Sequence, residues 1–471
     1  MEMMVHTARL ADDDSGGRAL ARVRSVRVVN ILAWSYPAPA SRLASELGLP
    51  DGERLYTTIA GSTPQWLLNR TCDDIASGAV DAVLIVGAET VDSGRQARAK
   101  GVPLERGERD TPVADEVIGD DRSAVSPQEM AARVVVPTTI YAMFESALAA
   151  QAGRTFSEQR RFVAGFMAPF TKVAASHADI AWFPVERTAD EIATVGPDNR
   201  LICDPYPKLC NAVMQVDMSA AIIVMSAEAA AAAGVPRDRW VFPLAGAECN
   251  DVFVTGERPD FTSSPAIATI GRKAFEAAGV GIDDVASIDL YSCFPSAVQI
   301  GAKALGISLD DPRGLTVTGG LPYDGGPGNN YVTHSIAMTV ESCRSDPGTL
   351  GLVTGNGWYV TKHSIGLYSG TPGDGWQHPS TAAEQTKIDA DALEIAVVGA
   401  DGVAVVDAMT IGHDRKHGAV AAPVYATLAD GRRVCAVPAE DSVPSALDGR
   451  NLVGEKVTIS MDGGRVLYEP A

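Results

Sequence analysis

Four segments of the chain carry residue types and spacings that could do chemistry, and the first precedes an expected helix. It runs from Tyr56 to Trp66 with the sequence YTTIAGSTPQW, and the helix pattern continues to about residue 77. Ser62 or Thr63 can cap this helix, and Pro64 suits its first turn. Backbone N–H groups at a helix start stabilise an anion or a developing thiolate, so a nucleophile placed here would be activated by geometry alone. The same residues also fit a plain capped helix with one face in the core.

The second segment, Ser287 to Ser296, has the sequence SIDLYSCFPS and predicts a strand that ends in a turn. The strand ends at Tyr291, and a helix resumes after the turn. Ligands of α/β proteins collect beyond the carboxyl ends of strands, so we expect Tyr291, Ser292 and Cys293 to face a cleft. The alternative is a packed turn in which Cys293 is a small buried hydrophobic residue.

The third and fourth segments are rich in glycine and run from Thr318 to His334 and from Thr354 to His363. So many glycines between apolar stretches indicate backbone conformations closed to other residues, or close approach to a ligand. Neither segment matches a Walker loop or a dinucleotide-binding fingerprint. His334 and His363 are candidates for proton transfer, but each also fits a structural, hydrogen-bonding histidine.

The composition limits the classes of molecule that this protein could bind. The chain has 471 residues, 46% of them hydrophobic and 21% charged, with a net charge of −20. Such an acidic surface repels nucleic acid and anionic membranes. No apolar run reaches the roughly 18 residues of a membrane-spanning helix, and the first residues lack a secretory pattern, so we expect a cytoplasmic protein. The seven cysteines form no C-x-x-C pair, which predicts reduced thiols and neither a disulfide framework nor a metal site.

The elements that must position these segments fall into three parts. Residues 1–99 alternate strand and helix patterns, and this rhythm returns in residues 266–368, which predicts two similar α/β halves. Between them, residues 94–210 predict a helical insertion. We therefore expect a first half over residues 1–250, a second half over 251–370 and a further domain over 381–471.

Short alternating strands separated by Asp-Gly turns predict that the further C-terminal domain is a small β-barrel. The turns lie at Asp401, Asp430 and Asp462. From residue 385 onward the chain has eight basic and thirteen acidic side chains, a net charge of −5 that disfavours an oligonucleotide-binding barrel. Packing against the rest of the chain, or contact with a protein partner, is the expected role.

Taken in order, the four segments resemble the thiolase superfamily, and most of all its lipid-transfer-protein-like thiolases and thiolase-like proteins of type 1. The resemblance spans residues 26–368 and includes a G-x-x-D-strand-G-x-E pattern from Gly78 to Glu89. It implies two thiolase-type halves layered as α/β/α/β/α, with an added C-terminal domain. It also implies CoA or acyl-CoA as the ligand, with no further cofactor and no metal, in an acetyl-CoA acetyltransferase-like protein of lipid metabolism.

Matched to that family, the chain has lost each catalytic side chain. The resemblance places Gly61 in the position of the nucleophilic cysteine, Gly326 in that of the histidine base and Gly351 in that of the second cysteine, with Tyr291 in the oxyanion box. Glycine supplies neither a nucleophile nor a base. Candidate catalytic residues are then Tyr291, Cys293 and His334. The expected substrate-binding residues come from all four segments: Gly61, Ser62, Thr63, Phe294, Gly325, Asn329, Gly355, Asn356 and His363.

Three functions follow from this pattern. The first is a CoA-thioester-binding protein, an acyltransferase by family, without thiolase activity. The second is a retro-aldol carbon-carbon lyase on a β-hydroxyacyl-CoA, in which Tyr291 works with Tyr323 or Tyr331. The third is a non-catalytic scaffold that recruits a protein partner through the C-terminal domain. Ser62 or Thr63 as a substitute nucleophile lacks an identifiable base.

The beginning of the chain departs from the family pattern. Thiolase-like halves begin with a strand, whereas this sequence opens on a helix pattern in its first twelve residues. We expect that strand to lie in the centre of the sheet. Its absence would leave neighbouring ladder groups unpaired, at about 1 to 3 kcal/mol for each buried group, which suggests a chain start further upstream.

Overall fold

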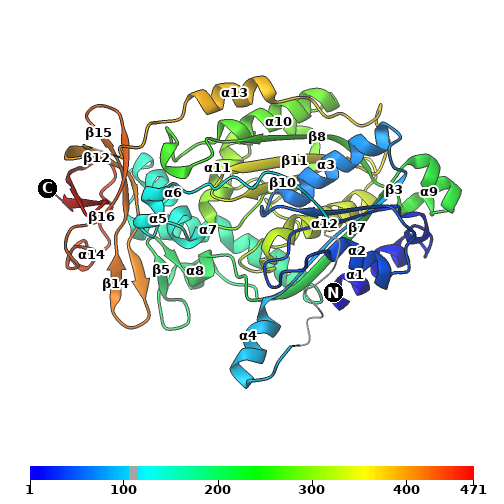
Figure 1. Ribbon diagram of the computed structural model, residues 1–471, viewed down its shortest axis with the longest axis horizontal. Helices are drawn as coiled ribbons and strands as arrows, with labels where there is room; N and C mark the ends of the chain where they lie inside the picture. The colour runs from blue at the N-terminus through cyan, green and yellow to red at the C-terminus, as the bar shows by residue number, and fades with distance from the viewer. Residues whose placement is uncertain (105–114, 398, 471) are drawn as a thin grey trace.

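The first half of the chain builds a mostly parallel sheet, and three of its five strands come from the first hundred residues (Figure 1). The computed structural model describes residues 1–104, 115–397 and 399–470. The sheet has the order β4-β2-β1-β3-β7, and only β7 runs antiparallel to its neighbour. Its strands are β1 (Ser25–Val28), β2 (Glu53–Thr57), β3 (Ala82–Thr90), β4 (Glu116–Ile118) and β7 (Asp217–Met225). The buried strand predicted before Glu89 is β3, all but one of whose residues are buried.

The second half builds a sheet of four strands in the order β8-β11-β10-β9. These are β8 (Phe242–Asn250), β9 (Val285–Asp289), β10 (Leu350–Gly357) and β11 (Lys362–Ser369). Here β9 and β10 are parallel, and β11 is antiparallel to both of its neighbours. The arrangement of β9, β10 and β11 repeats that of β1, β3 and β7, which confirms the two similar halves.

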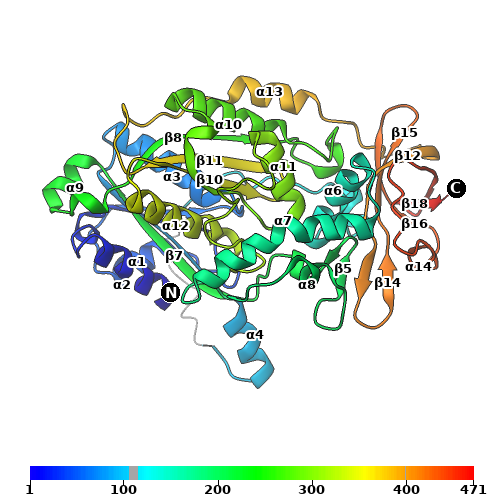
Figure 2. The ribbon, with the colours of Figure 1, turned by 180° about the vertical axis from the view of Figure 1, so that it is seen from behind.

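Two helices lie between the sheets and others cover the outer faces (Figure 2). The central pair is α3 (Thr63–Ala76) and α12 (Tyr331–Ser345), which contact each other and strands of both sheets. The residues of α3 are buried on more than one face, as expected for a helix enclosed by two sheets. The outer helices are α1 (Glu2–Asp14), α2 (Pro39–Glu46), α9 (Ala227–Ala233), α10 (Pro265–Ala278) and α11 (Pro295–Leu305). The predicted α/β/α/β/α layering is confirmed.

The expectation of a missing central strand is wrong. Strand β1 pairs directly with β3, Ser25 opposite Val83 and Val28 opposite Val86, so no ladder in the middle of the sheet is left open. The second half shows where the first strand of such a unit belongs. That strand is β8, and it lies at the sheet edge beside β11. An edge strand can be absent without exposing the groups inside the sheet.

The insertion between the halves is mainly helical. Its elements are α4 (Val91–Lys100), α5 (Pro127–Ala131), α6 (Pro137–Gln151), α7 (Phe156–Ser176), α8 (Ala189–Ala193), β5 (Leu201–Cys203) and β6 (Tyr206–Pro207). Residues 105–114 of the predicted insertion lie outside the described residues. Helix α6 is buried almost all round, because α11 and the barrel pack on different sides of it.

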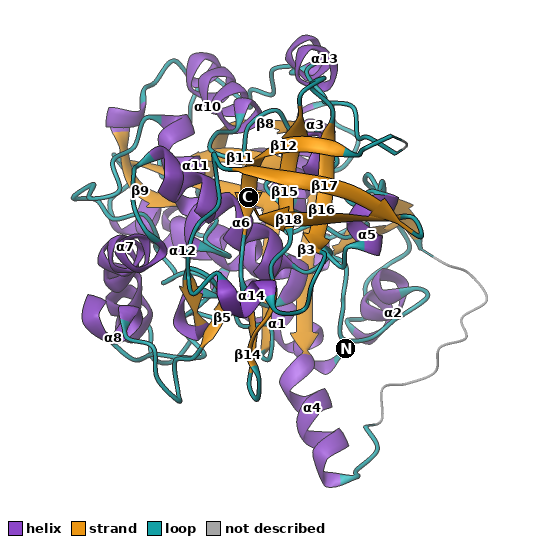
Figure 3. Cartoon of the chain, turned by 90° about the vertical axis from the view of Figure 1, so that its left-hand side faces the viewer, coloured by secondary structure: helices purple, strands orange, loops and turns teal. Residues whose placement is uncertain are grey.

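The C-terminal strands close into the predicted barrel, which forms one end of the molecule in Figure 1 and faces the viewer in Figure 3. They are β12 (Gly402–Met409), β15 (Val424–Leu428), β16 (Arg433–Pro438), β17 (Lys456–Asp462) and β18 (Arg465–Pro470), with α14 (Val443–Ala446) before β17. The closed order is β12-β15-β16-β18-β17. A hairpin of β13 (Gly412–Asp414) and β14 (Gly418–Ala421) leaves the barrel and pairs with β5. Helix α13 (Ala382–Ala390) precedes the barrel.

The face of the barrel formed by β15 and β16 lies against the rest of the chain. The ring of Tyr425 stacks on Phe261 at 5.1 Å, and its hydroxyl donates to the buried carboxylate of Glu129. The backbone N–H of Cys435 donates to Gln128 at 2.6 Å. In five-stranded oligonucleotide-binding barrels the second and third strands form the binding face. Here that face is covered, so a partner of the barrel would have to contact another side.

No helix within the described ranges is long and apolar enough to cross a lipid bilayer.

Candidate functional site

The start of helix α3 is the first part of the site. The helix begins at Thr63, with Ser62 in the cap position and Pro64 in the first turn, as predicted. The Ser62 side chain makes no capping hydrogen bond. Instead, the Ser62 carbonyl accepts a hydrogen bond from the Ser364 hydroxyl at 2.8 Å, which ties the helix start to β11. Ser62 and Thr63 are both buried.

Gly61 is enclosed by two residues of the second half. A Cβ atom on Gly61 would lie within 3.0 Å of both the Tyr291 hydroxyl oxygen and the Asn356 carbonyl oxygen, closer than Cβ atoms come to other atoms. Gly355 likewise faces the Ser62 backbone and leaves no space for a side chain. The structure therefore brings Gly61, Ser62, Tyr291, Gly355 and Asn356 together.

The turn after β9 is packed among aromatic rings. Phe294 stacks on Tyr141 of α6 with ring centroids 4.5 Å apart. The Tyr141 hydroxyl donates to the Trp358 carbonyl at 2.8 Å and accepts from the Asn356 amide at 3.0 Å. Cys293 is buried beside this network, and burial raises the pKa of its thiol to about 12. Cys293 is thus an unreactive thiol at neutral pH, as in the packed-turn alternative.

Tyr291 is also buried, and it meets Tyr331 edge to face at 5.7 Å between ring centroids. Burial, together with the nearby Cys293, raises the pKa of Tyr291 well above its usual value. Tyr291 therefore carries its proton at neutral pH. The cavity that it lines with Asn356, Gly355 and His363 has a volume of about 20 Å³, which holds at most one water molecule.

The glycine-rich loop before α12 lies against the first half. Gly325 has a positive φ of 124° and is covered by Met218, while the Gly326 N–H donates to the Val213 carbonyl at 2.9 Å. The Asn329 amide donates to the Asn30 carbonyl at 3.1 Å. These contacts hold the loop in place, and the short helix η6 (Gly328–Asn330), which contains Asn329, lies beside α3.

Two other predicted residues, Gly351 and His334, lie on β10 and α12. Gly351 stands near the beginning of β10 and faces Thr339 of α12. Since a strand rises about 3.3 Å per residue, Gly351 is far from the end of β10 that holds Asn356, so Asn356 and not Gly351 is the β10 residue beside Gly61. His334 is buried in the first turns of α12, and burial lowers the pKa of its imidazole to about 4. Its Nε2 atom has no partner among the described residues.

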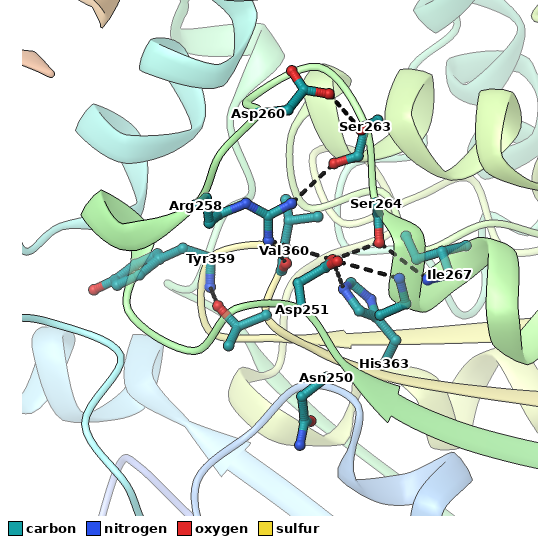
Figure 4. A network of polar contacts seen from close by, with 12 residues as sticks. Asn250, Asp251, Arg258, Asp260, Ser263, Ser264, Ile267, Tyr359, Val360 and His363 are labelled. Atoms are coloured by element: carbon teal, nitrogen blue, oxygen red, sulfur yellow. Dashed lines mark hydrogen bonds and ion pairs between the residues drawn. The ribbon is translucent and has the colours of Figure 1, made fainter. Parts of the chain in front are cut away.

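His363 belongs to a buried polar network at the ends of β8 and β11 (Figure 4). Its Nε2 atom lies 3.1 Å from Oδ2 of Asp251, which also accepts the Ser264 hydroxyl and lies 3.3 Å from the Arg258 guanidinium. Burial alone would raise the pKa of Asp251, but the Arg258 charge and the His363 hydrogen bond outweigh it and hold this pKa below its usual value. Asp251 is therefore a carboxylate at neutral pH.

A large cavity opens between the start of α3, the ends of β8 and β11, and the segment that leads into α13. It has a volume of about 770 Å³, and we call it the α3 cavity. Its lining includes Ser62, Thr63, Trp66, Arg70, Glu248, Lys362, His363, His378 and Gln385. His363 lines both this cavity and the small one beside Tyr291.

The α3 cavity carries cations on its wall. Arg70 is exposed and forms no ion pair with any described residue, while Lys362 donates to the Asp120 carbonyl. His378 lies between Asp73 and Glu248, at 2.6 and 2.9 Å. Burial lowers the pKa of His378, but Glu248 and Asp73 outweigh it and raise this pKa to about 9. His378 is therefore protonated at neutral pH. Within the described residues, no cluster of histidine, cysteine and acidic side chains could hold a metal ion.

Among the solved structures similar to this fold is one that matches the chain over nearly its whole length. It is the crystal structure of a monomeric SCP2-thiolase-like protein type 1 from Mycobacterium smegmatis, with a TM-score of 0.82 and 31% sequence identity. The match covers 98% of this chain and 91% of that one. The chain belongs to the SCP2-thiolase-like proteins of type 1. No family model and no curated protein matches it. The resemblance drawn from the four segments is thereby confirmed.

Sequence reasoning missed Arg70 and His378 on the wall of the α3 cavity. It also missed Asp251, Arg258 and Tyr141, which shape the site of this type 1 thiolase-like chain and lie outside the four segments. Asp251 carries one signal that could have identified it, because an acidic residue directly after a strand lies where α/β proteins collect ligands. Tyr141 carries no such signal, since its partners Asn356 and Trp358 are distant in the sequence. Arg258 lies close to Asp251 in the sequence, but its other partner, the Val360 carbonyl, is 102 residues away.

Proposed function

We propose that this thiolase-like chain binds a CoA thioester in the α3 cavity and does not carry out thiolysis or Claisen condensation. The observation that carries the proposal is the Tyr291 hydroxyl, which fills the space that a Cβ atom at position 61 would need. In the family pattern a nucleophilic cysteine belongs there. Thiolase chemistry needs a thiolate that holds the acyl group and a base that deprotonates the second acyl-CoA, and Gly61 and Gly326 supply neither.

The α3 cavity supports the binding part of the proposal. Its volume of about 770 Å³ lies within the range of roughly 300 to 1,000 Å³ of small-molecule sites. Arg70 and Lys362 bring positive charge to the wall of a chain whose net charge is −20. The phosphates of CoA would meet Arg70 on the cavity wall, and the N–H of Ser62 at the start of α3 would donate to the thioester oxygen.

Calorimetric titration with CoA, acetyl-CoA and acetoacetyl-CoA tests the binding directly. The variant Arg70→Ala should weaken CoA binding about tenfold, because one charge-assisted phosphate contact contributes roughly 1.5 kcal/mol. Arg98→Ala is the matched control, since Arg98 is also exposed and lies on α4 away from the cavity. Its affinity should stay within twofold of the parent. Absence of binding for all three compounds would contradict the proposal.

The catalytic part is tested by incubating the protein with acetoacetyl-CoA and CoA. No acetyl-CoA should form. Robust thiolysis would contradict the proposal, because it would require a nucleophile that the packing around Gly61 excludes.

The edge-to-face pair of Tyr291 and Tyr331 favours one second candidate, a retro-aldol lyase acting on a β-hydroxyacyl-CoA. In that reaction Tyr291 would act as the proton donor, because burial raises its pKa and keeps it protonated. Tyr291→Phe should then abolish cleavage of the β-hydroxyacyl-CoA. An unchanged cleavage rate in this variant, or no cleavage by the parent protein, would remove this candidate.

A further inference from the structure

The network of His363 and Asp251 has the features of a base rather than those of a merely buried histidine. Asp251 accepts hydrogen bonds from the Ser264 hydroxyl and from the Ala266 backbone N–H at 3.2 Å, and it is paired with Arg258. Arg258 is itself fixed by the Val360 carbonyl at 2.7 Å and the Ser263 carbonyl at 2.9 Å (Figure 4). The carboxylate is thus fixed in position before any ligand arrives.

The chemistry of this pair determines which nitrogen of His363 is the base. A carboxylate only accepts hydrogen bonds, so Nε2 of His363 must carry the proton that it donates to Asp251. In the neutral imidazole, Nδ1 then has the free lone pair. No described residue forms a hydrogen bond with Nδ1, and His363 is among the residues that line the α3 cavity. An imidazole oriented by a carboxylate through one nitrogen accepts protons through the other.

The position of His363 connects this base to the start of α3. In the register of the second sheet, His363 lies opposite Asn356, the residue whose carbonyl faces Gly61. The neighbouring Ser364 bonds the Ser62 carbonyl. The base and the start of helix α3 therefore face the same cavity from the two halves of the molecule.

We infer that His363 activates a water molecule in the α3 cavity, so that this chain hydrolyses acyl thioesters. The inference rests on the proposed function, which places a thioester there. With Gly61 in place of a nucleophilic side chain, no enzyme group attacks the acyl carbon, and water is the nucleophile that a base can activate. Asp251 is a positioning residue, because it acts through His363.

The step balances without any further reactant. The water oxygen bonds to the thioester carbonyl carbon as one of its protons passes to Nδ1 of His363. The N–H of Ser62 stabilises the negative charge on the carbonyl oxygen, since the Thr63 N–H already donates to the Ala60 carbonyl and Pro64 has no N–H. The C–S bond then breaks, and the imidazolium returns the proton to the leaving sulfur. The products are a carboxylic acid and a thiol.

The test measures thiol release from acetyl-CoA and from S-acetyl-N-acetylcysteamine, a thioester without a nucleotide. His363→Gln should lower kcat at least about a hundredfold, the contribution typical of a general base, with KM within twofold of the parent value. His417→Asn is the control and should leave both constants unchanged, because His417 is exposed on the hairpin next to the barrel. Asp251→Asn should also lower kcat at unchanged KM.

A rescue experiment distinguishes a variant that has lost only the base from one that has misfolded. Added imidazole should restore hydrolysis to the variant His363→Ala, whereas a purely structural role would give no rescue. A parent protein that hydrolyses neither compound, or an unchanged kcat in His363→Gln, would overturn the inference.

The two proposals fail in different ways. CoA binding without hydrolysis of either thioester would overturn the hydrolysis and leave the binding intact. Hydrolysis of S-acetyl-N-acetylcysteamine without CoA binding would overturn the proposed CoA ligand and support His363 as the base.

Discussion

The two halves of this molecule share a strand arrangement but differ at the edges of their sheets and in what they bring to the site. In the second half, β8 covers the edge of β11, and the segment around Gln377 in turn covers β8. In the first half, β7 has no partner strand on its outer edge among the described residues. Covering an edge protects unpaired backbone groups, so the second half is the better protected of the two.

The site shows the same asymmetry. Around Gly61 and His363 the first half contributes backbone, namely the start of α3, whereas the second half contributes the side chains of Tyr291, His363 and Asp251. Arg70 of α3 is a first-half side chain on the wall of the α3 cavity. The position of the nucleophile in one half can thus be filled by a side chain of the other half, because Tyr291 follows a strand of the second sheet and lies against Gly61 of the first half.

The largest change in stability is expected from adding a side chain at position 61 in the first half. Gly61→Ala should lower the free energy of unfolding by about 3 kcal/mol, since overpacking against Tyr291 and the Asn356 backbone forces one of them to move. Chemical denaturation measures the change. Gly165→Ala in α7, where nothing lies within 4 Å of the added atom, should instead raise stability by about 0.5 to 1 kcal/mol.

A double-mutant cycle sharpens this result. Combining Gly61→Ala with Tyr291→Phe should recover part of the loss, because the hydroxyl oxygen is one of the two obstructing atoms. Strict additivity of the two substitutions would show that the halves are not coupled through this contact.

The second prediction compares a buried carboxyl group of each half. Glu89 at the end of β3 accepts the backbone N–H groups of Leu32 and Ala33 at 2.7 and 2.8 Å, whereas Oδ2 of Asp324 has no partner among the described residues. Burial and the charge of Asp289 raise the pKa of Asp324 to about 8. A raised acid pKa means that stability falls as pH rises from about 4 to 8.

Asp324→Asn should therefore raise the free energy of unfolding by about 2 kcal/mol at pH 7 and have little effect at pH 4. Glu89→Gln should lower it, because an amide cannot accept both N–H groups as well as a carboxylate does. Urea titrations at the two pH values measure both variants. A destabilised Asp324→Asn protein at pH 7 would contradict the expectation.

The third prediction concerns the ion-pair link between the halves. His378 bridges Asp73 of α3 and Glu248 of β8, which raise its pKa to about 9. A raised histidine pKa gives stability that is complete below about pH 6.5 and is lost as pH rises through 9. His378→Gln should thus cost about 1 to 2 kcal/mol at pH 6 and almost nothing at pH 10. A cost that does not change with pH would rule out the ion pairs.

The smallest effect is expected at the covered edge of the second half. The Gln385 side chain accepts from the Asn250 backbone N–H at 2.7 Å and donates to its carbonyl at 3.0 Å. Gln385→Leu leaves both groups without these partners and should lower stability by about 1 kcal/mol. Lys387→Ala, an exposed change two residues along α13, should stay within about 0.5 kcal/mol of the parent. If both substitutions lowered the free energy of unfolding equally, the hydrogen bonds between Gln385 and Asn250 would contribute no stability.

Much of the local structure followed from the sequence. Period-2 runs and Asp-Gly turns predicted the barrel, and Pro64 marked the start of α3, because these signals depend on neighbours within a few residues. The first strand of each half was wrongly predicted to lie in the centre of its sheet, whereas β8 lies at an edge beside β11. Strand order depends on pairing between distant segments, which local patterns do not record.

The sequence by itself determined the two-half α/β architecture, the barrel and the presence of glycine where a nucleophile was expected. Only the tertiary structure decided that Tyr291 fills the space beside Gly61 and that Asp251 meets His363 from 112 residues away. The physical reason is that periodicity records which face of an element is apolar, whereas the register of β8 against β11 decides which polar side chains share a cavity.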